Sequence, residues 1–229
     1  MGRSRYTHAL TLPRMCLQTG VIGLKYCDGV MLAADNLASY GSMARYKDVQ
    51  RLHPVGHSTI IGAGGDMSDF QHIQHMLDSL VIEEFTYDDG NKLGPTEIYN
   101  YLSKVMYGRR SKMNPLWNAL VVGGVKPNGE GPICSFLGYV DLLGTTYQSP
   151  TIATGFGAYI AQPLLRNAVD TRSEPLSENE AVAVLQDCMK ALFYRDARSL
   201  NKYQIAKVTS EGVTISDPLE AKTVWGFAE

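Results

Sequence analysis

The chain has 229 residues, of which 45% are hydrophobic and 19% are charged, and its formal net charge is −2. These proportions are typical of a soluble globular protein that is long enough to bury a substantial core. The small negative charge gives no general case for a nucleic acid or an anionic membrane as partner. No apolar run approaches the roughly 18 residues of a membrane span, and the first residues lack the apolar stretch of a secretory signal.

The first predicted element is a hairpin near the N-terminus. Two short apolar runs, 21–26 and 30–34, flank Asp28 and Gly29. An Asp-Gly pair between two such runs indicates a tight turn, because glycine tolerates the positive φ that the turn needs. An antiparallel hairpin carries Thr19 and Asp35 to the same end. This hydroxyl and carboxylate fit the start of a nucleophile site, and they equally fit a strand-end Thr and a capping Asp.

The remaining elements alternate between strands and helix pairs. We expect a loop over 36–47, because this stretch is rich in Ser, Gly, Ala and Tyr. Apolar periodicity, turn residues and capping signals predict the other boundaries. They indicate strands at 49–55 and 58–62, helices from about 66 to 86 and 95 to 110, strands at 117–125, 133–140 and 147–153, helices at 158–170 and 177–194, and strands at 203–209 and 213–216. The run of four residues from Gly62 to Gly65 is expected to interrupt the strand before the first helix. Pro163 is expected to bend or restart the third helix.

The sequence predicts no metal site and no cofactor. The four cysteines, Cys16, Cys27, Cys134 and Cys188, form no CxxC pair, so buried free thiols are the expectation. His72 and His75 are three residues apart on a predicted helix, where a solvated face is the simpler interpretation.

Several segments carry a resemblance to a known family. They are Thr19 at the head of the hairpin and segments 29–35, 62–66 and 194–199. Together they resemble the β subunits of the 20S proteasome, which are N-terminal-nucleophile hydrolases. The resemblance implies an α+β fold, a four-layer αββα sandwich with two antiparallel sheets between two helical layers. It also implies an N-terminal extension at 1–18, a proteasome β-type domain at 19–216 and a C-terminal tail at 217–229.

The resemblance assigns roles to individual residues. In an active member the Thr hydroxyl is the nucleophile, its own freed α-amine is the base, a Lys–Asp pair tunes the site and a glycine N–H donates to the oxyanion. Five positions match this pattern: Thr19, Asp35, Gly65, Asp196 and Ser199.

Two positions of the pattern differ. Arg51 stands at the Lys position, where it keeps a positive charge that can pair with Asp35, but a guanidinium is effectively never deprotonated. Phe156 stands where active members carry Ser, and its ring is expected to fill the pocket. In addition, Gln18 replaces the Gly that precedes the nucleophile in self-processing members, so the amine of Thr19 is not expected to be freed.

The resulting hypothesis is a non-catalytic structural subunit that assembles with α and β subunits in stacked seven-membered rings. Its expected location is the cytoplasm and nucleus, and its expected role is to support ubiquitin-dependent protein degradation by active neighbours. The alternative is an active threonine endopeptidase subunit, or a self-sufficient homo-oligomeric peptidase, which Thr19, Asp35 and Gly65 motivate. A weaker alternative is nucleic-acid binding through Arg109, Arg110 and Lys112.

Overall fold

The computed structural model describes residues 16–17, 20–90, 92–126 and 134–226. Its strands are β1 (Cys16–Leu17), β2 (Val21–Tyr26), β3 (Gly29–Asp35), β4 (Ala38–Tyr40), β5 (Met43–Tyr46), β6 (Leu52–Val55), β7 (Thr59–Asp66), β8 (Asn118–Lys126), β9 (Cys134–Val140), β10 (Thr146–Gln148), β11 (Thr151–Ala153), β12 (Lys202–Thr209), β13 (Gly212–Ile215) and β14 (Leu219–Glu220). Its helices are α1 (Met67–Tyr87), α2 (Pro95–Ser111), α3 (Gly157–Asp170) and α4 (Glu178–Arg195).

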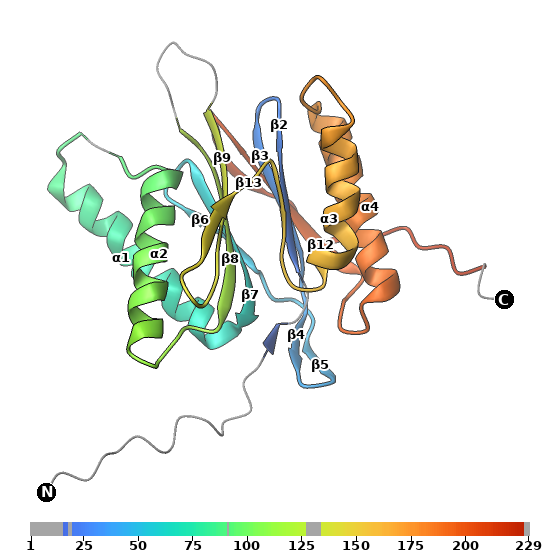
Figure 1. The fold of residues 1–229 in the computed structure, drawn as a ribbon, viewed down its shortest axis with the longest axis horizontal. Helices are drawn as coiled ribbons and strands as arrows, with labels where there is room; N and C mark the ends of the chain where they lie inside the picture. The colour runs from blue at the N-terminus through green and yellow to red at the C-terminus, as the bar shows by residue number, and fades with distance from the viewer. Residues whose placement is uncertain (1–15, 18–19, 91, 127–133, 227–229) are drawn as a thin grey trace, which may run out of the picture.

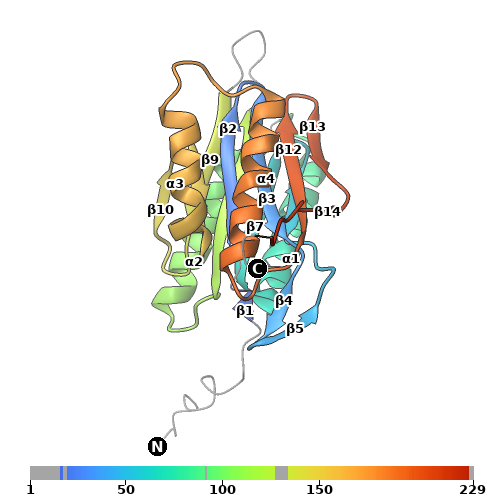
Figure 2. The ribbon, with the colours of Figure 1, turned by 90° about the vertical axis from the view of Figure 1, so that its right-hand side faces the viewer.

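Two antiparallel sheets are stacked between two helical layers (Figure 1). The first sheet has the order β1-β7-β8-β9-β10, with β6 also paired to β7, and the second has the order β11-β2-β3-β12-β13, with β14 paired to β12. Helices α1 and α2 cover the first sheet, whereas α3 and α4 cover the second, as the turned view in Figure 2 also shows. The predicted four-layer αββα sandwich is therefore confirmed.

Each interface between layers has its own apolar core. One cluster around Phe70, Ile73 and Leu102 lies between the first sheet and its helices. A second, around Val30, Leu32 and Val121, lies between the two sheets. A third lies between the second sheet and α3 and α4. Because β3 contributes to both of the latter clusters, all seven of its residues are buried, as its continuous apolar run predicts. In the described part of the chain, no helix has the length and apolar character that crossing a membrane requires.

The β2–β3 hairpin forms where the sequence places it, but its turn lies one residue earlier. Tyr26 pairs with Gly29, so Cys27 and Asp28 make the turn and Gly29 begins β3. Gly29 has φ +155°, and a Cβ there would collide with the carbonyl oxygen of Val208 on the neighbouring β12. Close strand approach, rather than the turn itself, therefore requires glycine at this position.

Three other expectations about elements are wrong. The stretch 36–47 contains the hairpin β4–β5 instead of a loop. Strand β7 continues through residues 62–65 to Asp66, because all these positions pair with β8 or β1 and need no side chain to do so. The stretch 147–153 contains two strands in different sheets, β10 and β11.

The helix boundaries agree better with the prediction. Asp66 accepts hydrogen bonds from the N–H groups of Ser68 and Asp69 and so caps α1. Ser177 and Glu180 form the predicted capping box of α4. Helix α3 continues through Pro163 without restarting.

The predictions for the cysteines are confirmed only in part, whereas the prediction for the two histidines is confirmed. Cys188 is buried as predicted, but Cys27 and Cys134 are exposed free thiols, because one lies in the hairpin turn and the other begins β9. His72 and His75 are both exposed, which confirms the solvated face.

Candidate functional site

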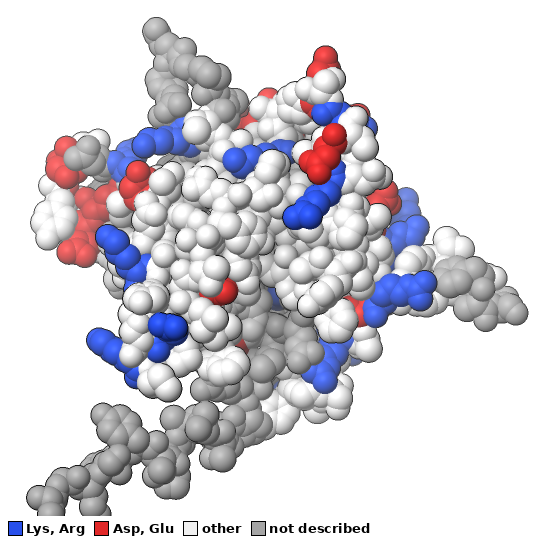
Figure 3. Space-filling model, viewed as in Figure 1, with Lys and Arg blue, Asp and Glu red and all other residues white. Residues whose placement is uncertain are grey.

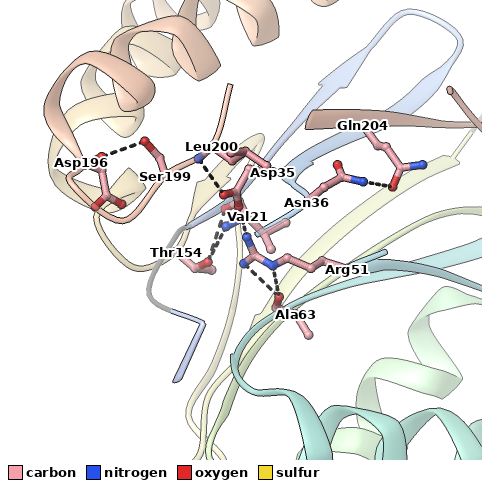
Figure 4. A network of polar contacts seen from close by, with 10 residues as sticks. All are labelled: Val21, Asp35, Asn36, Arg51, Ala63, Thr154, Asp196, Ser199, Leu200 and Gln204. Carbon is pink, nitrogen blue, oxygen red and sulfur yellow. Dashed lines mark hydrogen bonds and ion pairs between the residues drawn. The ribbon is translucent and has the colours of Figure 1, made fainter. Parts of the chain in front are cut away.

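The candidate site is organised around a buried ion pair between Arg51 and Asp35 (Figure 4). Each residue is only 1% exposed. The Arg51 Nη1 donates to Asp35 Oδ1, while its Nε and Nη2 donate to the carbonyl oxygen of Ala63 at 3.2 and 3.0 Å. The second carboxylate oxygen of Asp35 accepts from the backbone N–H of Leu200 at 3.4 Å. The sequence brought Arg51 and Asp35 together correctly but gave no signal for Ala63 or Leu200.

This ion pair connects the two sheets. Asp35 ends β3 in the second sheet, whereas Ala63 lies in β7 of the first. A guanidinium can satisfy partners on both because its donors point in several fixed directions, whereas an ammonium is a compact point charge. Arg51 therefore serves as a structural tie between the sheets.

Asp196 and Ser199 form a separate turn after α4. The Asp196 carboxylate accepts from the N–H of Arg198 at 2.9 Å, and the Ser199 hydroxyl donates to the carbonyl oxygen of Asp196 at 2.7 Å. Asp196 is 6% exposed, and its Oδ2 has no hydrogen-bond partner among the described residues. Figure 4 shows this turn beside Asp35 and Leu200. The predicted supporting serine is thus bonded within its own turn.

Gly65 lies near the end of β7 in a conformation that excludes other residues. Its φ is +106°, and a Cβ there would collide with the carbonyl oxygen of Trp117. The same carbonyl accepts from the N–H of Asp66 at 2.8 Å, which holds this part of the strand in place. The glycine predicted for the oxyanion position is therefore required by the backbone whether or not any chemistry occurs.

The backbone on the N-terminal side of position 19 pairs with this same strand. Cys16 is opposite Asp66 and Leu17 is opposite Gly65 in the antiparallel pairing of β1 with β7. Strand β1 also contacts β4. The chain's own backbone consequently occupies the edge of β7 next to Gly65.

Thr19 and Gln18 lie outside the described residues. On the C-terminal side, Thr154 holds the start of β2. Its Oγ1 accepts from the N–H of Val21 at 2.9 Å, and its own N–H donates to the Val21 carbonyl oxygen at 2.9 Å. Gly20 has no room for a Cβ beside the Thr154 carbonyl oxygen. The sequence analysis missed Thr154, for which the only signal is its position before the Gly155 turn.

Phe156 does not fill a buried pocket, contrary to the expectation. Its side chain is 48% exposed at the N-cap of α3, where it makes no capping hydrogen bond. A serine at an N-cap can accept from the first backbone N–H groups of the helix, which a phenyl ring cannot do. The described residues also contain no group of three or more His, Cys, Asp and Glu side chains arranged to hold a metal ion.

Comparison with known proteins identifies the family. The family described as proteasome subunit matches residues 18–208, which is most of the chain. The chain is 50% identical to a proteasome subunit beta type-4 from Xenopus laevis over 95% of its own length and 88% of the relative's. It is 48% identical to a proteasome subunit beta type-4 from Arabidopsis thaliana, covering 92% of this chain and 82% of that one.

A further relative comes from fission yeast. The chain is 51% identical to a probable proteasome subunit beta type-7 from Schizosaccharomyces pombe, over 92% of this chain and 80% of the relative. The chain therefore belongs to the proteasome subunit family. Within it, the chain groups with the β type-4 subunits of the 20S core particle, and it is a component of a proteolytic complex.

Proposed function

We propose that this chain is a non-catalytic structural β subunit of the 20S core particle. It occupies the seventh β position in hetero-oligomeric stacked seven-membered rings of the cytoplasm and nucleus. There it supports the degradation of ubiquitin-tagged proteins by active neighbours. The observation that carries the proposal is the buried Arg51, bonded to both Asp35 and the Ala63 carbonyl oxygen.

The chemistry follows from the difference between a guanidinium and an amine. A lysine at this position could lose or share a proton during nucleophile activation, whereas arginine keeps its proton throughout the accessible pH range. Arg51 is further committed to two acceptors on different sheets. Its charge and geometry therefore suit structure and not proton transfer.

The surface supports a role in assembly. The face on which α2 and α3 lie toward the viewer is largely uncharged across its centre, with basic and acidic residues toward its rims (Figure 3). Large exposed apolar side chains on α2, on α3 and near β10 are Tyr107, Leu143, Tyr147, Tyr159 and Leu164. These side chains are available for contact with neighbouring subunits, which supports the proposed role without identifying the surface that each neighbour covers.

A covalent inhibitor directed at N-terminal threonines tests the proposal. The purified complex is treated with the inhibitor, and adducts on each subunit are mapped by mass spectrometry. We expect adducts on the active subunits, which serve as the internal control, and none on Thr19. The intact mass of this chain is expected to show that residue 19 is not the N-terminus. An adduct on Thr19 would overturn the proposal.

The framework around position 19 favours one alternative, an active threonine endopeptidase subunit. It is motivated by Asp35, Gly65 and Asp196, which match the sequence pattern of active members. The alternative predicts that silencing the neighbours' nucleophiles leaves peptidase activity that a Thr19→Ala variant abolishes.

A further inference from the structure

A cavity of about 230 Å³ lies at the opposite end of β2 from position 19. Its walls include Pro150, Val169 and Leu176, and its polar lining includes Lys25 and Ser135. It thus lies where β2 extends beyond the end of its neighbour β11, beside the connection between α3 and α4. The cavity is smaller than the roughly 300–1,000 Å³ of sites for drug-sized ligands, so it fits a fragment-sized molecule.

Lys25 lies one residue before the end of β2. It is partly buried between the buried residues Leu24 and Tyr26 of this largely apolar strand. Among the described residues, its ammonium group has no hydrogen-bond or ion-pair partner, whereas Lys207 pairs with Glu178. Burial lowers the pKa of Lys25, and the negative charge of Cys134 in its thiolate form acts in the opposite direction and raises it by a smaller amount.

Among the described residues, the other titratable groups around the cavity form no ion pair with Lys25. Glu174 lines the cavity from the α3–α4 connection but makes no ion pair with Lys25 in the described structure. The pKa of Tyr26 is raised to about 12, mainly by burial, so its phenol stays neutral at physiological pH. A partly desolvated amine without a carboxylate partner holds its proton less tightly and is a better nucleophile.

We propose that Lys25 is a carbonyl-reactive lysine, and that this cavity takes small aldehydes with a short apolar chain. The neutral Nζ attacks the aldehyde carbon and forms a carbinolamine. Loss of one water then gives an imine, so that one amine and one aldehyde yield one imine and one water, with no change in oxidation state. The apolar walls formed by Pro150, Val169 and Leu176 contact the chain of the aldehyde and thereby favour the bound imine over the free aldehyde.

Reductive trapping on the intact complex tests the proposal. The purified complex is incubated with hexanal and sodium cyanoborohydride, and the occupancy of each lysine is measured by mass spectrometry after digestion. Lys47, Lys92 and Lys222 are exposed and serve as internal references. At about pH 7.5 we expect Lys25 to be labelled at least about threefold faster than each reference. At about pH 10 the ratio should fall, because the reference amines also deprotonate.

Two matched variants separate the cavity from general surface reactivity. Val169→Glu places a carboxylate on the cavity wall, which should stabilise the ammonium and reduce labelling of Lys25 at least about threefold. Asn167→Glu adds the same charge at an exposed position of α3 and should leave labelling within about 1.5-fold of wild type. Lys25→Arg should remove the adduct from this peptide.

The opposite results would overturn the proposal. They are labelling of Lys25 at or below the reference lysines at about pH 7.5, or a ratio that is the same at both pH values. Where Val169→Glu does not assemble into the complex, the pH dependence of the wild-type ratio decides the matter.

Discussion

Each end of the β sandwich contains a cationic side chain, and the two side chains differ in burial and in hydrogen bonding. At the site end, Arg51 is fully buried and bonded to both sheets. At the cavity end, Lys25 is only partly buried and has no partner among the described residues. A fully buried cation such as Arg51 is retained with hydrogen-bond partners, whereas a partly exposed amine such as Lys25 can remain in the fold without them.

The largest expected effect comes from removing the cation at the site end. Arg51→Met leaves the Asp35 carboxylate buried without its partner and should lower the opening free energy of β3 and β7 by about 3–5 kcal/mol. Hydrogen exchange of these strands in the purified complex measures it. The Asp35→Leu/Arg51→Met double variant should recover most of the loss, because it leaves no unpaired buried charge. If Arg51→Met were as stable as wild type, the ion pair would not stabilise this end of the sandwich.

Substitution of Gly65, at the same end of the sandwich, should destabilise the fold almost as strongly. Gly65→Ala combines an unfavourable φ of +106° with a collision against the Trp117 carbonyl oxygen. We expect a loss of at least about 2 kcal/mol, measured by the same exchange experiment. Gly41→Ala is the control, since Gly41 also has a positive φ, at +61°, but open space around it. Gly41→Ala should lower the stability by about 1 kcal/mol, from its backbone conformation alone. If the two variants lost the same stability, the contact with the Trp117 carbonyl oxygen would contribute nothing.

Removal of the Lys25 charge, at the cavity end, should raise the stability of the fold slightly. Lys25→Met keeps the apolar stem and removes an unpartnered amine, so stability should rise by up to about 1 kcal/mol. The pKa of Lys25 is lowered in the folded chain. Its protonated form therefore weakens the fold at neutral pH, and this penalty falls as pH rises through the folded pKa. The advantage of the variant, measured by exchange of β2, should shrink between about pH 7 and pH 10.

The smallest effect concerns the capping box beside the cavity. Hydrogen bonds from Arg172 and Ser177 lower the pKa of Glu180 to about 2. Its contribution is fully present above the ordinary carboxyl pKa and is lost as pH falls through about 2. As pH drops from about 5 to 2, the hydrogen-exchange protection of α4 should therefore fall less in Glu180→Gln than in wild type. Equal acid sensitivity of the two proteins would contradict this assignment.

The sequence predicted the architecture where a local signal decides the structure. The capping residues Asp66 and Ser177 set the helix starts, and the apolar run of β3 indicated a strand covered on both faces. The failures are positions where tertiary contacts decide. Gly29 and Gly65 are needed for close backbone approach, and β4–β5 forms a hairpin in a stretch without apolar alternation.

The candidate site was predicted in its residue identities but not in its bonding. Arg51 and Asp35 meet as expected, whereas the Ala63 carbonyl oxygen, the Leu200 N–H and Thr154 are backbone or short polar groups that carry no sequence pattern. Lys25 was missed for a similar reason. A single lysine in an apolar strand looks like an exposed edge residue until the covering elements are placed.

The bridge that Arg51 makes has a consequence for any substitution at position 51. A lysine there would have to abandon either Asp35 or the Ala63 carbonyl oxygen, since one nitrogen cannot reach as widely as a planar fork. The same position thus sets both the charge beside Asp35 and the spacing of the two sheets. A change of residue type there would require a second, compensating change elsewhere in the core.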